Sequence, residues 1–298
     1  MSTETVVTNG LTKRYGDKNV VDGVHLRVRA GEIYGFLGPN GAGKTTTLRM
    51  LVGLVRPTSG TATVLGSPPG APSAAARTGV LIEGPGFHPY LSGLDNLRFL
   101  SRLRGFPDDA AVFALERVGL GARGSDKFRT YSLGMKQRLG VAAALVGEPD
   151  LLILDEPTNG LDPAGVAEMR ALIVDLAKQG HTIVLSSHML AEVQEMCDRV
   201  GVISDGRLLV ESTVSELRGA TRLFVRANPL QRAEVVVREL LGDGVVTRVQ
   251  DGIEISVPVD RAPKVAEALV RDGVDLLELT SQERTLEDVF FEMTGVQA

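Results

Sequence analysis

The chain has 298 residues, of which 43% are hydrophobic, so it can form one large domain or two ordinary ones with sizeable cores. Its net charge is −5, and acidic and basic residues are interspersed without a long run of Lys and Arg, which argues against a nucleic-acid-binding surface. The single cysteine, Cys197, excludes an internal disulfide framework and fits a reducing compartment.

The first predicted elements are two β-branched stretches, residues 6–8 and 20–28, with turn residues between them. Their partly alternating pattern is typical of antiparallel strands. Tyr15 lies on the short loop that joins them. Its ring would either stack on a purine base or lie half-buried against the protein, and the residues alone favour the second interpretation.

A glycine-rich loop follows an apolar stretch at residues 33–37 and precedes a helical pattern at residues 47–52. It has the form G-x-x-x-x-G-K-T, and a strand before it and a helix after it are the context in which such a loop binds phosphate. Backbone N–H groups and the helix N-terminus would surround a polyphosphate, Lys44 would reach its terminal phosphates, and Thr45 would ligate Mg²⁺. The predicted nucleotide-binding residues are Gly38, Pro39, Asn40, Gly41, Ala42, Gly43, Lys44, Thr45 and Thr46.

A helical insertion is predicted next. Residues 79–83 read as a buried strand that ends in the carboxylate of Glu83, and residues 84–90 form a loop rich in Gly, Pro and aromatic rings. Helices are predicted at about 94–104 and 108–118. Such an insertion either docks a partner or only packs against the domain, and the sequence favours neither.

A second potential phosphate-binding site lies at residues 131–138, just before a predicted helix at 139–146. Ser132 and Gly134 would lie at the N-terminus of that helix. Since one nucleotide cannot easily use two separate sites in one chain, a head-to-tail pair of chains, each completing the other's site, explains both. The alternative is that Ser132 only caps the helix.

An acidic pair follows the apolar residues 151–154, whose lack of alternation is typical of a central parallel strand. Asp155 and Glu156 would then lie at the carboxyl end of the strand, where α/β sheets bind ligands. Asp155 would hold Mg²⁺ through water, and Glu156 would polarise the attacking water.

Another strand, at residues 182–187, ends at His188. A single His is usually structural, but the end of a strand parallel to the acidic one favours a contact between His188 and the γ-phosphate. Between these strands, Asp162 is predicted to cap a helix at 164–178.

The final third of the chain has a different pattern of predicted elements. A closing hairpin at 200–210 is followed by a βαββαβ pattern, typical of a small ferredoxin-like unit. It carries no group of Cys, His or paired carboxylates, so we expect an accessory domain for dimerisation or regulation, with effector binding as the alternative. Residues 285–294 place apolar side chains on one helical face and predict a docking helix.

In order and spacing, these motifs resemble the ATP-binding subunit of ABC transporters over at least residues 5–215. Residues 186–193 and 285–290 are most similar to bacterial drug- and antibiotic-export ATPases of the daunorubicin/bacitracin-resistance kind. The resemblance implies an α/β P-loop NTPase of ABC type, with a mixed sheet core, an antiparallel β subdomain and a helical subdomain at about 87–147. This ATP-binding domain would span 1–220, and the ferredoxin-like α+β domain 221–298.

The resemblance also implies a function. Two copies would bind MgATP in a head-to-tail sandwich, hydrolyse it, and power export through a separate polytopic membrane subunit that selects the cargo. Since the N-terminus lacks a signal-peptide pattern and the longest uncharged run, 57–76, is rich in Pro, Gly, Ser and Ala, we expect a cytoplasmic chain that reaches the inner face of the membrane through that partner.

Site roles follow from the same resemblance. Glu156 would be the catalytic base and His188 the switch histidine, while Thr45, Glu83 and Asp155 would hold Mg²⁺. The implied nucleotide and dimer contacts are Tyr15 for the base, Ser132 and Gly134 for the phosphates in trans, and Asp162 for the dimer seam.

Two motifs depart from the family pattern. The signature is usually Leu-Ser-Gly-Gly-Gln, whereas residues 131–135 read Tyr-Ser-Leu-Gly-Met; the Ser and second Gly are retained, so we expect the sandwich to form. Glu83 occupies the place of a Gln that usually ligates Mg²⁺ and water. A carboxylate adds negative charge near the γ-phosphate, so we expect slower or more tightly partner-gated hydrolysis.

Two other classes of protein explain fewer of these motifs. ABC-type ATPases that remodel ribosomes or DNA usually carry two nucleotide domains or long coiled-coil insertions, which this sequence lacks. A P-loop kinase would not explain residues 131–138 or the adjacent Asp155 and Glu156.

Overall fold

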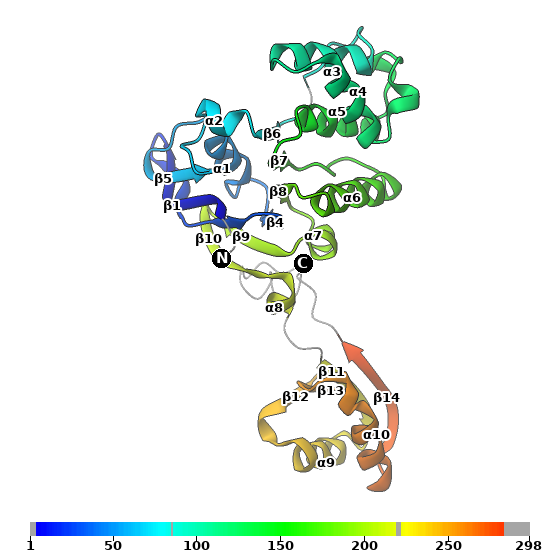
Figure 1. Ribbon diagram of the computed structural model, residues 1–298. Helices are drawn as coiled ribbons and strands as arrows, with labels where there is room; N and C mark the ends of the chain where they lie inside the picture. Colours follow the sequence, from blue (N-terminus) through cyan, green and yellow to red (C-terminus); the bar gives the residue numbers. More distant parts are fainter. Residues whose placement is uncertain (1–3, 85, 219–221, 283–298) are drawn as a thin grey trace. The chain divides into compact units, whose positions relative to one another are not determined.

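The computed structural model describes residues 4–84, 86–218 and 222–282 (Figure 1). The chain divides into two compact units, residues 1–213 and 214–298. Within the described ranges, no helix is both long and apolar enough to cross a membrane.

A six-stranded sheet of order β10-β9-β4-β8-β7-β6 forms the centre of the first unit. All neighbouring strands in it are parallel except β9 and β10, which form the predicted closing hairpin. Strands β4, β7 and β8 are almost fully buried, as the apolar runs within them predict. The strands are β4 (Ile33–Leu37), β6 (Thr78–Leu81), β7 (Leu151–Asp155), β8 (Thr182–Ser187), β9 (Arg199–Ser204) and β10 (Arg207–Thr213).

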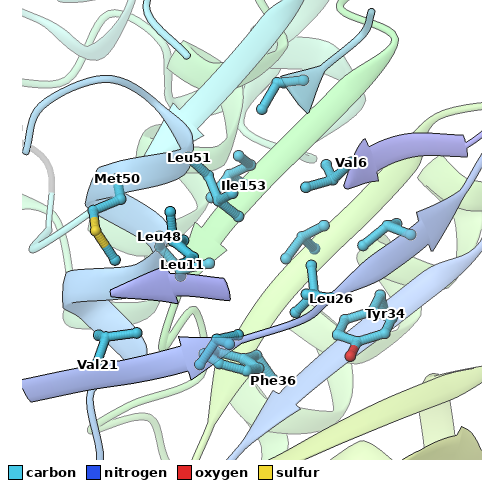
Figure 2. Packing of buried hydrophobic residues seen from close by; sticks show 14 of the residues in the cluster. Val6, Leu11, Val21, Leu26, Tyr34, Phe36, Leu48, Met50, Leu51 and Ile153 are labelled. Carbon is cyan, nitrogen blue, oxygen red and sulfur yellow. The ribbon is translucent and has the colours of Figure 1, made fainter. Parts of the chain in front are cut away.

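An antiparallel sheet lies beside this central sheet. Its long strand β1 (Glu4–Tyr15) pairs with β2 (Lys18–Val24), β3 (Arg27–Arg29) and β5 (Ser59–Val64). Helix α1 (Lys44–Leu51) and both sheets share one apolar core, shown in Figure 2, to which β1 contributes Leu11, β4 Phe36, α1 Leu48 and β7 Ile153. This core fixes the start of α1 against the ends of β4 and β7, which positions the glycine-rich loop.

Three helices pack together beside β6: α3 (Gly93–Leu103), α4 (Asp108–Arg117) and α5 (Leu133–Leu145) (Figure 1). Helix α5 approaches β6 closely because Gly79 has no side chain; a Cβ there would lie 2.1 Å from the carbonyl oxygen of Ala144. Helices α6 (Pro163–Lys178) and α7 (Leu190–Met196) pack against each other and against β8. The short helices are α2 (Pro72–Ala75), η1 (Gly121–Arg123) and η2 (Phe128–Thr130).

Several element boundaries differ from the predictions. Residues 6–8 are part of the longer strand β1, so Tyr15 ends a strand and is not on a loop, and residues 20–28 are divided between β2 and β3. Strand β6 ends at Leu81, so Glu83 lies in a turn with a left-handed φ of 62° and not at the end of a strand. Helix α5 begins at Leu133, six residues before the predicted start, because Ser132 provides its N-cap.

The second unit begins with α8 (Val214–Arg218) and has the predicted ferredoxin-like order of elements. Its antiparallel sheet has the strand order β12-β13-β11-β14. Helices α9 and α10 share one core with the strands, and ion pairs such as Arg222–Glu254 (2.8 Å) and Arg226–Glu278 (3.3 Å) lie on neighbouring strands. The predicted helix at 285–294 lies outside the described residues. The elements are β11 (Arg222–Asn228), α9 (Leu230–Leu241), η3 (Asp243–Val245), β12 (Val246–Val249), β13 (Gly252–Ile255), η4 (Val259–Arg261), α10 (Ala262–Arg271) and β14 (Asp275–Gln282).

Candidate nucleotide-binding site

The glycine-rich loop leaves β4 and enters α1, and its glycines are required for two different reasons. A Cβ at Gly38 would lie 2.3 Å from the carbonyl oxygen of Ile203, so the close approach of the chain requires Gly there. Gly43 has a φ of 105°, a backbone conformation that residues with side chains rarely adopt. The loop borders a pocket of about 200 Å³ lined by Val20, Pro39, Asn40, Gly41, Gly43, Lys44, Thr45, Thr46 and Glu156.

The ammonium group of Lys44 is held over this loop. Its Nζ donates to the carbonyl oxygens of Gly38 (2.6 Å) and Pro39 (3.3 Å), and lies 3.1 Å from Oε1 of Glu156. The side chain of Lys44 is only 6% exposed. A buried cation at the start of a helix is suited to bind the negative charge of a polyphosphate, which would have to displace the carboxylate of Glu156 from the ammonium group.

Asp155 joins the loop to the neighbouring strands. The hydroxyl of Thr45 donates to its Oδ2 (2.8 Å), and the hydroxyl of Ser186 donates to its Oδ1 (2.5 Å). Carboxylate and hydroxyl oxygens are donors that Mg²⁺ prefers, so these residues fit that ion. No group of three or more His, Cys, Asp or Glu that could hold a metal occurs among the described residues. Phosphate oxygens commonly supply further ligands to Mg²⁺ when it binds with a nucleotide.

Glu156 lies between Lys44 and His188. Its Oε2 is 2.7 Å from Nδ1 of His188, while Oε1 contacts Lys44. Because an ionised carboxylate only accepts hydrogen bonds, Nδ1 of His188 is the donor. The backbone N–H of Glu156 donates to Oγ of Ser186 (2.9 Å), and its φ of 48° is in the left-handed region. The structure thus brings together the ends of β4, β7 and β8 as the sequence predicts.

Ser132, Gly134 and Asp162 do not line this pocket. Ser132 Oγ accepts the N–H of Met135 (3.2 Å) and caps α5, and Asp162 Oδ1 accepts the N–H of Gly165 (3.1 Å) and caps α6 as predicted. A Cβ at Gly134 would lie 3.9 Å from a side-chain carbon of Leu161, so these two helix starts are neighbours.

Tyr15 and Glu83 also lie outside the lining of the pocket. Tyr15 is 51% exposed, and Nζ of Lys13 lies 4.9 Å from the centre of its ring. The carboxylate of Glu83, which is 63% exposed, forms an ion pair with Arg49 in the last turn of α1.

Sequence reasoning missed Ser186, which binds both Asp155 and the backbone of Glu156. Asp155 and Ser186 are direct partners in the parallel register of β7 and β8. Two polar residues that end an otherwise apolar strand were the signal that pointed to this position.

These features define a P-loop nucleotide-binding ATPase: a glycine loop between a buried strand and a helix, with Lys and Thr on the helix and an acidic pair on a parallel strand. The profile of the ABC transporter family matches residues 21–159. The chain is 41% identical over 297 residues to the bacitracin transport ATP-binding protein BcrA of Bacillus licheniformis, and the match covers 97% of each chain.

Two further proteins are similar over a shorter range. The lantibiotic transport ATP-binding protein SrtF of Streptococcus pyogenes is 38% identical over 214 residues, which are 93% of SrtF and 72% of this chain. The solved structure of cbiO1 from Clostridium perfringens, part of the ABC transporter complex cbiONQ, has a TM-score of 0.65 and 29% identity, and covers 72% of this chain and 90% of cbiO1.

The chain belongs to the ATP-binding proteins of ABC transporters, and it is an ATPase whose hydrolysis is coupled to transport. This confirms the fold class and the family resemblance inferred from the motifs. The ribosome- and DNA-remodelling alternative is not favoured by these relatives.

Proposed function

We propose that this chain powers the export of a drug, antibiotic or lipid-like compound through a separate membrane subunit. The names of BcrA and SrtF support the class of cargo. The observation that carries the catalytic part is the position of Glu156 at the phosphate pocket, where it contacts both Lys44 and His188.

Nucleotide binding would rearrange this trio. Phosphate oxygens at the glycine loop would compete with Glu156 for the ammonium group of Lys44, so binding would free one carboxylate oxygen. Tyr15 would stack on the base. Thr45 and Asp155 would hold Mg²⁺, whose positive charge would neutralise the phosphates.

The freed carboxylate of Glu156 would then orient and deprotonate the attacking water. His188 donates through Nδ1 to Glu156, and when its ring is protonated Nε2 also donates. Nε2 would hold the γ-phosphate, so one imidazole would align the base and the reacting group.

The second half of the site would come from another copy of the chain. Ser132 and Gly134 lie at the start of a 13-residue helix but outside the pocket of their own chain, and their neighbour Leu133 is half exposed. A head-to-tail dimer would bring this helix start to the partner's γ-phosphate, with Asp162 near the seam.

The membrane subunit would dock at an apolar groove of about 420 Å³ where the loop after β6 meets α3 and α5. Phe87, Leu91 and Phe99 line it, and Tyr90 beside it is 66% exposed. Asn96 fixes the loop, since its amide binds both the N–H and the carbonyl of His88 (2.8 and 3.1 Å). Docking here would hold the chain at the inner face of the cell membrane, with residues 221–298 as an accessory domain.

Purification of the tagged chain from its native cell after mild detergent extraction tests this proposal. We expect a polytopic membrane protein in stoichiometric amount. Phe99→Glu should lose this partner, while Phe113→Glu, at an equally exposed position on α4 outside the groove, should retain it. Recovery of ribosomes or DNA without a membrane protein would overturn the proposal.

A further inference from the structure

Two hydrogen bonds connect residues 156–162, directly after β7, with residues 188–192, directly after β8. The first joins Glu156 to His188 (2.7 Å). The second lies deeper: Oγ1 of Thr158 donates to Oε2 of Glu192 (2.5 Å), and these residues are only 3% and 4% exposed. The second bond runs in the opposite direction to the first, because its donor is on the segment after β7. It lies two residues further along that segment and four residues further along the segment after β8.

Glu192 lies on a rigid support. It is in the first turn of α7, and the next residue, Val193, is fully buried against β4. This contact is close because Gly35 of β4 has no side chain; a Cβ there would lie 2.8 Å from Val193 and 2.9 Å from the sulfur of Cys197. Burial, together with the charge of Asp198, raises the pKa of the Cys197 thiol, as expected for a dry interface. Helix α7 is therefore tightly seated on the sheet.

The segment held by Glu192 needs such support. The φ of Glu156 is 48°, a conformation that residues with side chains rarely adopt and that persists only where the surroundings impose it. The hydroxyl oxygen of Ser186 accepts the N–H of Glu156 (2.9 Å). The carbonyl oxygen of Glu156 accepts the N–H of Asn159 (3.1 Å). The Thr158–Glu192 bond is the side-chain link that ties the following turn to the core.

Burying the carboxylate of Glu192 costs desolvation free energy that packing alone does not explain. Its second oxygen, Oε1, is buried and has no hydrogen-bond partner among the described residues. A buried carboxylate with one hydrogen bond is a poor source of stability, since an apolar side chain of similar size would avoid the desolvation cost. What the carboxylate provides is a fixed acceptor for Thr158.

We propose that Glu192 is a positioning residue of the ATPase. Through Thr158 it fixes the backbone of Glu156, and so keeps the carboxylate of Glu156 aligned with His188. This inference rests on the proposed roles of Glu156 and His188, and neither Glu192 nor Thr158 would touch the nucleotide.

Steady-state ATP hydrolysis by the full-length chain tests it with Thr158→Val, Glu192→Leu and Glu192→Gln. We expect kcat to fall about tenfold in the first two, since small misplacements of a catalytic group cost one to two orders of magnitude. The KM for ATP should change less than about twofold, because the loop around Lys44 is untouched. Glu192→Gln keeps an acceptor oxygen for Thr158 and should retain most of kcat.

Two further variants separate positioning from simple destabilisation. The double variant Thr158→Val/Glu192→Leu is apolar on both sides, so it should fold, and its kcat should be no lower than that of either single variant. Glu195→Gln is the matched control, because Glu195 is on the same helix but exposed and paired with Arg170 (3.0 Å). Its kinetics should be unchanged.

A folded double variant with wild-type kcat would overturn the inference, as would equal losses in Glu192→Gln and Glu192→Leu. Glu156→Gln, measured in parallel, distinguishes this failure from that of the proposed function. Loss of turnover in Glu156→Gln with normal turnover in the Glu192 variants overturns only the positioning role. Turnover retained in Glu156→Gln overturns the proposed function itself.

Discussion

Lys44 and Glu156 are the two residues whose contact most directly opposes nucleotide binding. Their 3.1 Å ion pair is largely buried, since the side chains are 6% and 18% exposed, so it is weakly screened by water. A phosphate that takes up the ammonium group of Lys44 must first separate this pair. Glu156 is therefore both the proposed base and an internal competitor of the substrate.

The first prediction follows from this competition. Glu156→Gln removes the charge that competes for Lys44, so ADP should bind roughly three- to tenfold more tightly, as the loss of about 1 kcal/mol of opposing ion pair implies. Isothermal titration calorimetry measures it, and ADP avoids any effect of hydrolysis. Lys44→Ala should instead weaken ADP binding at least tenfold. An unchanged affinity in Glu156→Gln would mean that the ion pair does not oppose binding.

Glu83 gives a second prediction at this scale. Its charge is expected to slow hydrolysis, and the structure shows that Arg49 is its partner. Glu83→Gln should therefore raise basal turnover several-fold, whereas Arg49→Gln, which leaves the carboxylate unpaired, should lower it. Steady-state phosphate release from the full-length chain measures both. The expectation fails if Glu83→Gln leaves turnover unchanged, or if the two variants change it in the same direction.

Among the elements, helix α5 has a proposed role in dimerisation that its local structure does not by itself establish. Ser132 caps it, and the cap alone explains why Ser is there. The same hydroxyl of Ser132 would also contact a phosphate bound to the partner chain. A separate experiment is needed to distinguish this contact from capping.

Two substitutions of Ser132 separate these roles. Asp caps a helix as well as Ser does, so Ser132→Asp should keep the melting temperature, whereas Ser132→Ala should lose about 1 kcal/mol of stability. If Ser132 also faces the partner's γ-phosphate, the added carboxylate should abolish ATP-dependent dimers, while Ser132→Ala should only weaken them. Thermal unfolding and dimer mass by light scattering give the two readouts. Normal dimers of Ser132→Asp would leave capping as the only role.

Several elements were predictable because their patterns are strong. The unbroken apolar runs of β4, β7 and β8 and the βαββαβ order of the last unit are found in the structure. The early start of α5 was missed because residues 133–138 mix polar and apolar side chains without helical periodicity. The partners of Lys44, Glu83 and Glu192 depend on how distant segments meet, which composition and spacing do not specify.

At the scale of the whole molecule, the chain consists of two units of different size, and SrtF matches only 72% of its length. The residues around the phosphate pocket all belong to the first unit. Nucleotide should therefore stabilise that unit alone.

Calorimetry of the full chain tests this division. We expect two unfolding transitions, of which only one moves on addition of ADP. At a concentration about 100 times the Kd, a ligand stabilises its domain by about 2.7 kcal/mol, which corresponds to roughly 5–10 °C for a unit of this size. One transition that shifts as a whole would instead indicate that the two units unfold cooperatively.

In the proposed mechanism, two chains close on ATP and hydrolysis separates them. The most direct measurement is the mass of full-length Glu156→Gln in solution with MgATP, by light scattering coupled to size exclusion, with Lys44→Ala/Glu156→Gln as the control. We expect Glu156→Gln to be a dimer with MgATP and a monomer with MgADP, and the control to be a monomer with either nucleotide. A monomer of Glu156→Gln at saturating MgATP would contradict it.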